Sequence, residues 1–344
     1  MNISVKLTVL TFMLIAAIPL QSVGQRMDVS LKNGSPVRGE FKDTSIEKLT
    51  VGSVEISVDN IRNVVLSDEP LEMKTARKRF EDSRFDDGLA ELDKINEKIS
   101  EKVVEQELDF MRVQGAAGSA LNGGKVATKE AGRIASEFLK KYPNSYRFYF
   151  VVDFAGALFA SSGMNAEAIA EFKKLANSNL SEFKVRGNFN IGKVSLAAGD
   201  AKTAATTLLE ILNAEDNSES TQKIKVIADP LYAKALAFDG KVDEARKRVL
   251  DLIARESSEN QELFAACYNV LGICDKASGD FKSAALNFLH TDLLFRGGDS
   301  HAEALYYLAA EIWPKLEKAD LALEARESLK RLYPGSFWWA KLNK

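Results

Sequence analysis

The sequence predicts a mainly α-helical protein, an α-solenoid of about seven helix-turn-helix units that follows a small all-β module. Three observations support this fold class. Residues 27–67 alternate between apolar and polar side chains, the periodicity from Leu71 onward is helical, and one phrase recurs through the helical part. We expect three segments, which are an export signal at 1–24, a β module at 25–69 and a helical repeat domain at 70–344.

Residues 1–24 have the composition of a removable export signal. Lys6 precedes an apolar run, and Ser22 and Gly24 are small residues at the −3 and −1 positions of a cut before Gln25. The run is shorter than the roughly 20 apolar residues of a membrane-spanning helix, and an uncleaved anchor is the alternative. No Cys stands at the cut, which argues against a lipoprotein. We therefore expect a periplasmic or cell-envelope protein.

Residues 27–67 carry the pattern of four or five short strands. Val54, Ile56 and Val58 alternate with polar residues, and turn signals stand at Asn33-Gly34 and Gly52-Ser53. The strands are expected near 27–32, 36–42, 46–51, 54–58 and 61–66. Because about 40 residues bury little area, the module should be a small barrel that leans on something else for stability.

The stretch VSLKNGSPVRGEF followed by IRNVVL resembles the small Sm-like or SH3-like barrels. Many Sm-like barrels bind RNA, but this segment of an exported chain has few basic or aromatic residues. A structural cap or docking module is the favoured interpretation, with binding of a cell-wall glycan or another polymer as an alternative function.

Composition excludes several classes of function. Charged residues of both signs are mixed along the helices, and the formal net charge is −3. This distribution gives no basic patch of the kind that binds nucleic acid or an anionic membrane. Cys267 and Cys274 are the two cysteines. Seven residues apart on one helix, they lie about 10.5 Å apart along the axis, too far for a disulfide. We expect two buried thiols.

The repeated sequence pattern consists of a turn residue, a charged stretch, a small residue and, four positions after the small residue, a large apolar residue. The small residues are separated by 43, 37, 36, 41, 39 and 38 positions, as counted from their numbers, and are Gly88, Ala131, Ala168, Ala204, Ala245, Ala284 and Ala322. The large residues are Leu92, Phe172, Leu208, Val249 and Phe288. A small residue lets a partner helix approach, and the large one fills the adjoining groove.

This pattern resembles the tetratricopeptide repeat, a helix-turn-helix of about 34 residues, over residues 70–344. The resemblance implies a right-handed solenoid with a small residue in the first helix, 12 positions before the small residue of the second. Five residues fill that slot, namely Gly156, Gly192, Gly272, Ala233 and Ala310. Departures are the lack of a clear first-helix signature in the first unit and the Gly-rich segment 115–125, expected to be a loose helix end and a long loop. An irregular helical bundle is the alternative.

Two similar segments, KKYPNSYRFYF and KRLYPGSFWWA, mark the ends of units. Pro143 and Pro334 each stand 12 residues after a repeat alanine and should stop a second helix, and Ser145 and Ser336 should cap the segment beyond each proline. These motifs are similar to those of exported bacterial repeat proteins, such as outer-membrane assembly and Tol-Pal coordinating factors, which implies envelope assembly components as partners. The terminal FWWAKL is expected to cover the end of the array, with an exposed docking patch as the alternative.

The sequence contains almost no candidate catalytic residues. The motifs G-x-S-x-G, G-x-x-x-x-G-K-[ST] and H-E-x-x-H are absent. A metal site at His290, Asp292, Asp299 and His301 is the weaker alternative to an interpretation in which the two histidines end one helix and begin the next. We therefore expect a non-enzyme without a cofactor.

Stacked repeats leave a concave surface lined by first helices, where such proteins bind extended peptides or partner helices. Helical spacing and alignment of the units predict a mildly basic partner-binding groove, with Asp153 and Tyr307 at its ends. Its residues are Arg186, Phe189, Asn190, Lys193, Lys234, Asn269 and Lys276. An ordinary solvated face is the alternative. The favoured function is an exported scaffold or adaptor that binds another protein.

Overall fold

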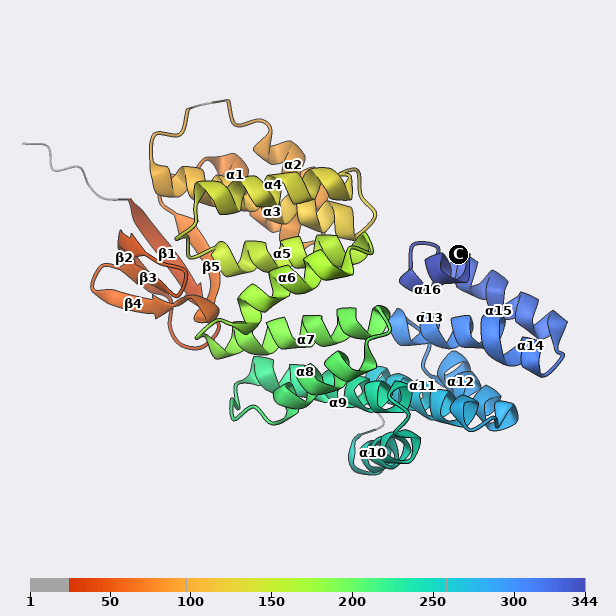
Figure 1. The fold of residues 1–344 in the computed structure, drawn as a ribbon. Coiled ribbons are helices and arrows are strands. Elements are labelled where there is room, and N and C mark those ends of the chain that lie inside the picture. The colour runs from red at the N-terminus through yellow and green to blue at the C-terminus, as the bar shows by residue number, and fades with distance from the viewer. Residues whose placement is uncertain (1–24, 97, 258, 344) are drawn as a thin grey trace, which may run out of the picture.

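The computed structural model describes residues 25–343 apart from 97 and 258, so the predicted export signal lies outside the described residues. A five-stranded sheet precedes a long series of helices (Figure 1). The strands are β1 (Arg26–Leu31), β2 (Val37–Thr44), β3 (Lys48–Val51), β4 (Val54–Ser57) and β5 (Ile61–Leu66). A 3₁₀ turn, Val58–Asn60, precedes β5.

The helices pair as first and second members of seven units within the described residues. The first helices are α1 (Leu71–Glu81), α3 (Lys102–Leu121), α5 (Phe148–Ser161), α7 (Ser181–Ala197), α9 (Glu219–Phe238), α11 (Gln261–Ala277) and α13 (Gly298–Tyr307), which continues through a π-helical turn (Leu308–Ile312) into α14 (Trp313–Lys315). The second helices are α2 (Phe85–Leu92), α4 (Thr128–Lys141), α6 (Asn165–Ala176), α8 (Ala201–Leu212), α10 (Val242–Arg255), α12 (Phe281–Leu294) and α15 (Ala319–Leu332). A short α16 (Phe337–Leu342) ends the chain.

The β module is an antiparallel sheet with the order β4-β3-β2-β1-β5. The first half of β2 pairs with β1 and the second half with β3, with an irregularity after Phe41. The sheet therefore bends within β2, as it must when so few strands wrap around a core. The predicted turns are present, because Gly34 and Gly52 both have positive φ at the two hairpin ends.

The core of the β module is continuous with the core of the helices. Val29, Leu49 and Val64 are buried in the same cluster as Tyr146 and Phe183, which lie beside α5 and in α7. Polar contacts also join the module to the helices, among them those from Lys32 to Glu182, from Asn179 to Glu47, from the Tyr146 amide to Thr44 Oγ1 and from Arg77 of α1 to Glu69. The small module was expected to need support from outside itself, and the helices supply that support.

The small residues of the repeat lie where helices pair most closely. A Cβ atom on Gly156 would lie 2.5 Å from the Phe172 ring, and one on Gly192 would lie 2.7 Å from Leu208. The same relation holds for Gly272 with Phe288, at 2.8 Å. Each of these three glycines therefore receives the large residue that stands 16 positions later in the second helix. The predicted packing rule is confirmed.

Two predictions for the last unit are wrong. Ala322 and Ala310 are only partly buried, whereas Ala325 and Leu329 of α15 are buried. The small and large residues keep their spacing of four, but start three positions later. Ala310 belongs to the π-helical turn, whose wider i→i+5 hydrogen bonding rotates the residues out of the register of an α-helix.

The Gly-rich segment 115–125 is also different from its prediction. Residues 115–121 complete the long helix α3, and the loop to α4 takes only 122–127. Cβ atoms on Gly115 and Gly118 would lie 2.7 Å from Leu89 and 2.3 Å from Phe85. These glycines therefore allow α2 to lie close against α3. Composition alone did not distinguish this packing role from a loose helix end.

The two Tyr-Pro motifs end their helices as expected. α4 ends at Lys141 and α15 at Leu332, directly before each motif. Both tyrosines hydrogen-bond to the first helix of their own unit, Tyr142 to Asp109 at 2.9 Å and Tyr333 to His301 at 2.7 Å. Ser336 caps α16 by accepting a hydrogen bond from the Trp339 amide, while Ser145 accepts one from Arg147 within the preceding turn.

The terminal helix α16 covers the last unit. Trp338 is buried against Tyr306 and Tyr307, with ring centroids 5.3 and 6.1 Å apart, and its Nε1 donates to Asp299. Phe337 stays about half exposed. Cys267 and Cys274 are free and buried as predicted, and burial raises the pKa of Cys267 to about 12 and that of Cys274 to about 11.

Candidate functional site

Successive first helices pack against one another along one side of the array, from α7 through α9 and α11 to α13. Lys234 of α9 reaches Glu303 of α13, two units further on, with Nζ 2.6 Å from Oε2. A side chain spans two units only where the array curves toward it. We call this side, which carries Asp153, Arg186, Lys234, Asn269 and Glu303, the inner face.

Most predicted groove residues are held by carboxylates of neighbouring helices. Arg186 lies 3.0 Å from Glu182 and 3.4 Å from Asp153, which also accepts a hydrogen bond from Asn190 at 2.9 Å. Glu182 also binds Lys32, the residue that follows β1. Burial raises the pKa of Asp153, against the opposing effect of Arg186 and Asn190. The β module and the start of the inner face therefore share one polar cluster.

A second polar cluster joins α9, α11 and α13. Asn269 donates to Glu303 Oε2 and to the Ser300 carbonyl, and Lys234 pairs with the same carboxylate. Lys234 and Glu303 are buried, so this ion pair is shielded from water. Lys276 pairs with Glu311 at 2.6 Å and lies 5.0 Å from the Tyr307 ring centroid.

Two cations near the inner face have no carboxylate partner within the described part of the chain. Lys193 is exposed, with Nζ 5.6 Å from the Phe189 ring centroid. Lys341 of α16 lies over the Tyr306 and Trp338 rings, and partial burial lowers its pKa. Lys193 and Lys341 are thus free to meet an anionic group.

The structure does not bring the four residues of the alternative metal site together. His301 is buried between Asp292 and Tyr333, whereas His290 stacks on Tyr268 with a centroid distance of 4.8 Å. Asp299 accepts from Trp338 instead. Among residues 25–96, 98–257 and 259–343, no three His, Cys, Asp or Glu side chains are grouped as metal ligands. His290 lies near the end of α12 and His301 near the start of α13, as expected.

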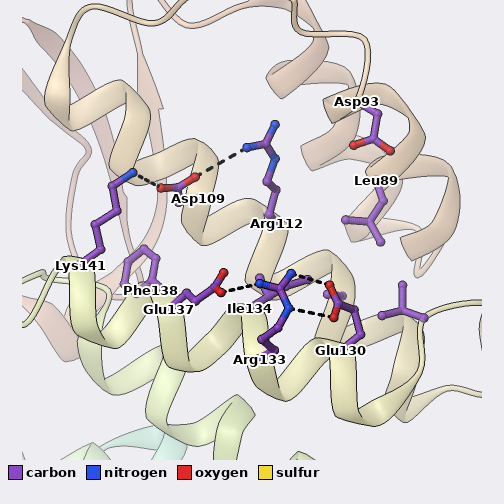
Figure 2. A pocket seen from close by; sticks show the side chains of 12 residues that line it. Leu89, Asp93, Asp109, Arg112, Glu130, Arg133, Ile134, Glu137, Phe138 and Lys141 are labelled. Carbon is purple, nitrogen blue, oxygen red and sulfur yellow. Dashed lines mark hydrogen bonds and ion pairs between the residues drawn. The ribbon is translucent and has the colours of Figure 1, made fainter.

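A groove of about 490 Å³ lies on another part of the molecule, between α2, α3 and α4 (Figure 2). Its apolar floor includes Ala116, Ile134 and Phe138, and charged side chains surround it. Sequence reasoning missed this groove. The one signal that could have indicated it is the short second helix of the first unit, whose periodicity ends at Leu92.

No family model matches the sequence, and no curated protein matches it. Solved structures do match. A tetratricopeptide repeat protein from Parabacteroides merdae has a TM-score of 0.59 and 11% identity, covering 79% of this chain and 98% of its own. The helical part has a tetratricopeptide-type fold. A Rap protein complexed with Competence and Sporulation Factor has a TM-score of 0.53 and 16% identity, covering 78% of this chain and 76% of its own.

Stacked repeats of this fold expose a long surface along the array. The shared fold extends over more than three quarters of the chain in both matches. No helix in the described residues is both long enough and apolar enough to cross a membrane.

Proposed function

We propose that this protein is an exported, non-catalytic scaffold that binds a protein or peptide through the inner face of its repeat array. The observation that carries the proposal is the row of packed first helices α7, α9, α11 and α13. Phe189, Asn190 and Lys193 stand beside one another on α7, and Lys341 of α16 lies over Tyr306 of α13. Ion pairs fix the neighbouring side chains, so binding would cost little side-chain entropy.

An acidic or carboxylate-bearing segment suits this wall best. Lys193 and Lys341 have no carboxylate of their own among the described residues, and Arg186 and Lys276 remain partly exposed at their ion pairs. Charge-assisted hydrogen bonds to carboxylates are the strong polar contacts available to such cations. Envelope assembly components remain our proposed partners.

The test is recovery of partners from an envelope fraction by the mature chain and by two variants. Lys193→Glu changes an exposed residue and should reduce partner recovery at least several-fold without changing the melting temperature. Lys234→Glu is unsuitable, because it would place a second acid beside the buried Glu303. Glu327→Lys on α15 is the matched control for a surface charge reversal. Direct titration of the recovered partner completes the test, and equal affinity for wild type and Lys193→Glu would refute an inner-face site.

Export is tested separately. The mature protein should begin at Gln25 by N-terminal sequencing and should be released with the envelope fraction. A retained N-terminus would favour the anchor, and recovery with the cytosol would refute export.

A further inference from the structure

The groove between α2, α3 and α4 exists because α2 is shorter than every other second helix of the described units. α2 has 8 residues, whereas the others have 12 to 14. Four to six residues are therefore missing at this position, which is roughly 6–9 Å of helix. The chain leaves the repeat pattern after Leu92 and enters the connection to α3.

The contacts between α2 and α3 show where the missing turns would lie. Phe85 packs against Gly118 and Leu89 against Gly115, so advancing four residues along α2 moves three residues back along α3. Continuing this register places the next turns opposite Arg112 and Asp109. Both residues line the groove, so its open length corresponds to the absent end of a helix.

The walls of the groove fit an amphipathic helix. Ala116 and Phe138 are buried, and Leu89, Val126 and Ile134 are half-buried, which gives an apolar strip along its floor. In Figure 2, Arg112 of α3 stands apart from Arg133 of α4, whereas Lys141 of α4 meets Asp109 of α3. A helix that laid an apolar stripe there would replace the packing that a full-length α2 gives elsewhere.

The charges around the groove indicate what the flanks of such a helix should carry. Arg133 is held by Glu130 and Glu137, and Lys141 by Glu105 and Asp109. Within the described residues, Arg112 pairs only with Asp109, at 3.7 Å, and Asp93 has no ion pair. An acidic residue of the helix beside Arg112 and a basic one beside Asp93 would give these two side chains ion-pair partners.

We propose that this groove is a second docking site, which accepts a short amphipathic helix of a partner protein with an acidic and a basic flank. The site is distinct from the inner face and would let one chain hold two partners.

The test uses the mature chain and a hydrocarbon-stapled 12-residue helical peptide with leucines at i, i+3, i+4 and i+7, a Glu on one flank and a Lys on the other. Titration calorimetry should show saturable binding, and replacing the leucines by Ser should abolish it. Ile134→Asp on the floor should weaken binding at least tenfold. Lys193→Gln on the inner face is the control and should leave the affinity unchanged.

Double-mutant cycles keep the test valid if Ile134→Asp misfolds. Arg112→Gln combined with Glu→Gln in the peptide, and Asp93→Asn combined with Lys→Gln in the peptide, should each show a coupling of about 2- to 5-fold. The proposal fails if the peptide does not bind, if both couplings are absent, or if Lys193→Gln abolishes binding. That last result would assign the peptide to the inner face instead.

Discussion

At the scale of single residues, the repeat depends on glycines that lack a Cβ atom where a large side chain arrives. Gly156 and Gly192 each face the ring or branched end of a buried residue at less than 3 Å from their would-be Cβ. Gly132 of α4 differs, because nothing lies within 4 Å of its would-be Cβ. Gly156 and Gly192 are therefore needed for close helix packing, whereas Gly132 is not.

We expect Gly156→Ala to lower the free energy of unfolding by about 1–3 kcal/mol, since overpacking against Phe172 outweighs the gain in helix propensity. Gly132→Ala is the matched control and should raise the free energy of unfolding by up to about 1 kcal/mol. Urea unfolding followed by circular dichroism measures both. Equal effects of the two substitutions would contradict the packing role.

Asp216 predicts a dependence of stability on pH. Although partial burial opposes ionisation, hydrogen bonds from Ser218, Thr221 and Ser181 lower the pKa of Asp216 to about 2. The ionised carboxylate therefore stabilises the fold above about pH 4, and this contribution is lost as the pH falls toward 2. Asp216→Asn should be less stable than wild type at pH 7, with the difference in unfolding midpoint disappearing near pH 2. A difference that stays constant over this range would refute the assignment.

At the scale of elements, two small parts of the chain cover the repeat array. The β module packs on its side, where α5 and α7 begin, and α16 covers its last unit at α13. Each repeat contacts chiefly its neighbours, so the loss of a cover should act locally.

Trp338→Ala should destabilise the last unit by about 3 kcal/mol, because it removes a buried ring from Tyr306 and Tyr307. Hydrogen exchange measured by mass spectrometry should accelerate in α13 and α15 and remain unchanged in α5 to α8. Phe337→Ala, at a half-exposed position, is the control and should change little. Uniform acceleration throughout the chain would show that the array unfolds as a single unit.

At the scale of the whole molecule, the buried pair of Lys234 and Glu303 connects helices two units apart and so holds the curvature of the array. Breaking a buried ion pair leaves one uncompensated charge, whereas replacing both partners by apolar residues can be neutral. The Lys276 and Glu311 pair is more exposed and should contribute less.

Glu303→Ala should therefore cost about 3–5 kcal/mol in stability and increase the radius of gyration in small-angle scattering. The double variant Lys234→Met with Glu303→Leu should recover most of the stability. Glu311→Ala is the matched control, with an expected cost below about 1 kcal/mol. An unchanged radius of gyration in Glu303→Ala would show that the pair does not set the curvature.

The sequence by itself determined the order of elements, the strand turns and the helix pairing, because periodicity and small-residue spacing are local properties of the chain. It placed Gly156 at a small-residue position and Phe172 at a large-residue position of one unit, since this spacing is repeated in other units. It also placed the residues of the proposed inner-face site on first helices. The division into two domains stays a prediction, because a single core crosses from the strands to the helices.

Only the tertiary structure decided how the inner-face charges are used and where the open groove lies. Glu303 is 69 residues from Lys234, and no periodic pattern specifies that they meet, because the curvature of the stack sets that distance. The buried small residue of α15 is Ala325 instead of Ala322. This shift comes after a π-helical turn that the sequence spacing did not predict. The groove results from the shortness of α2. A missing stretch of helix leaves a groove only because α3 and α4 lie beside it.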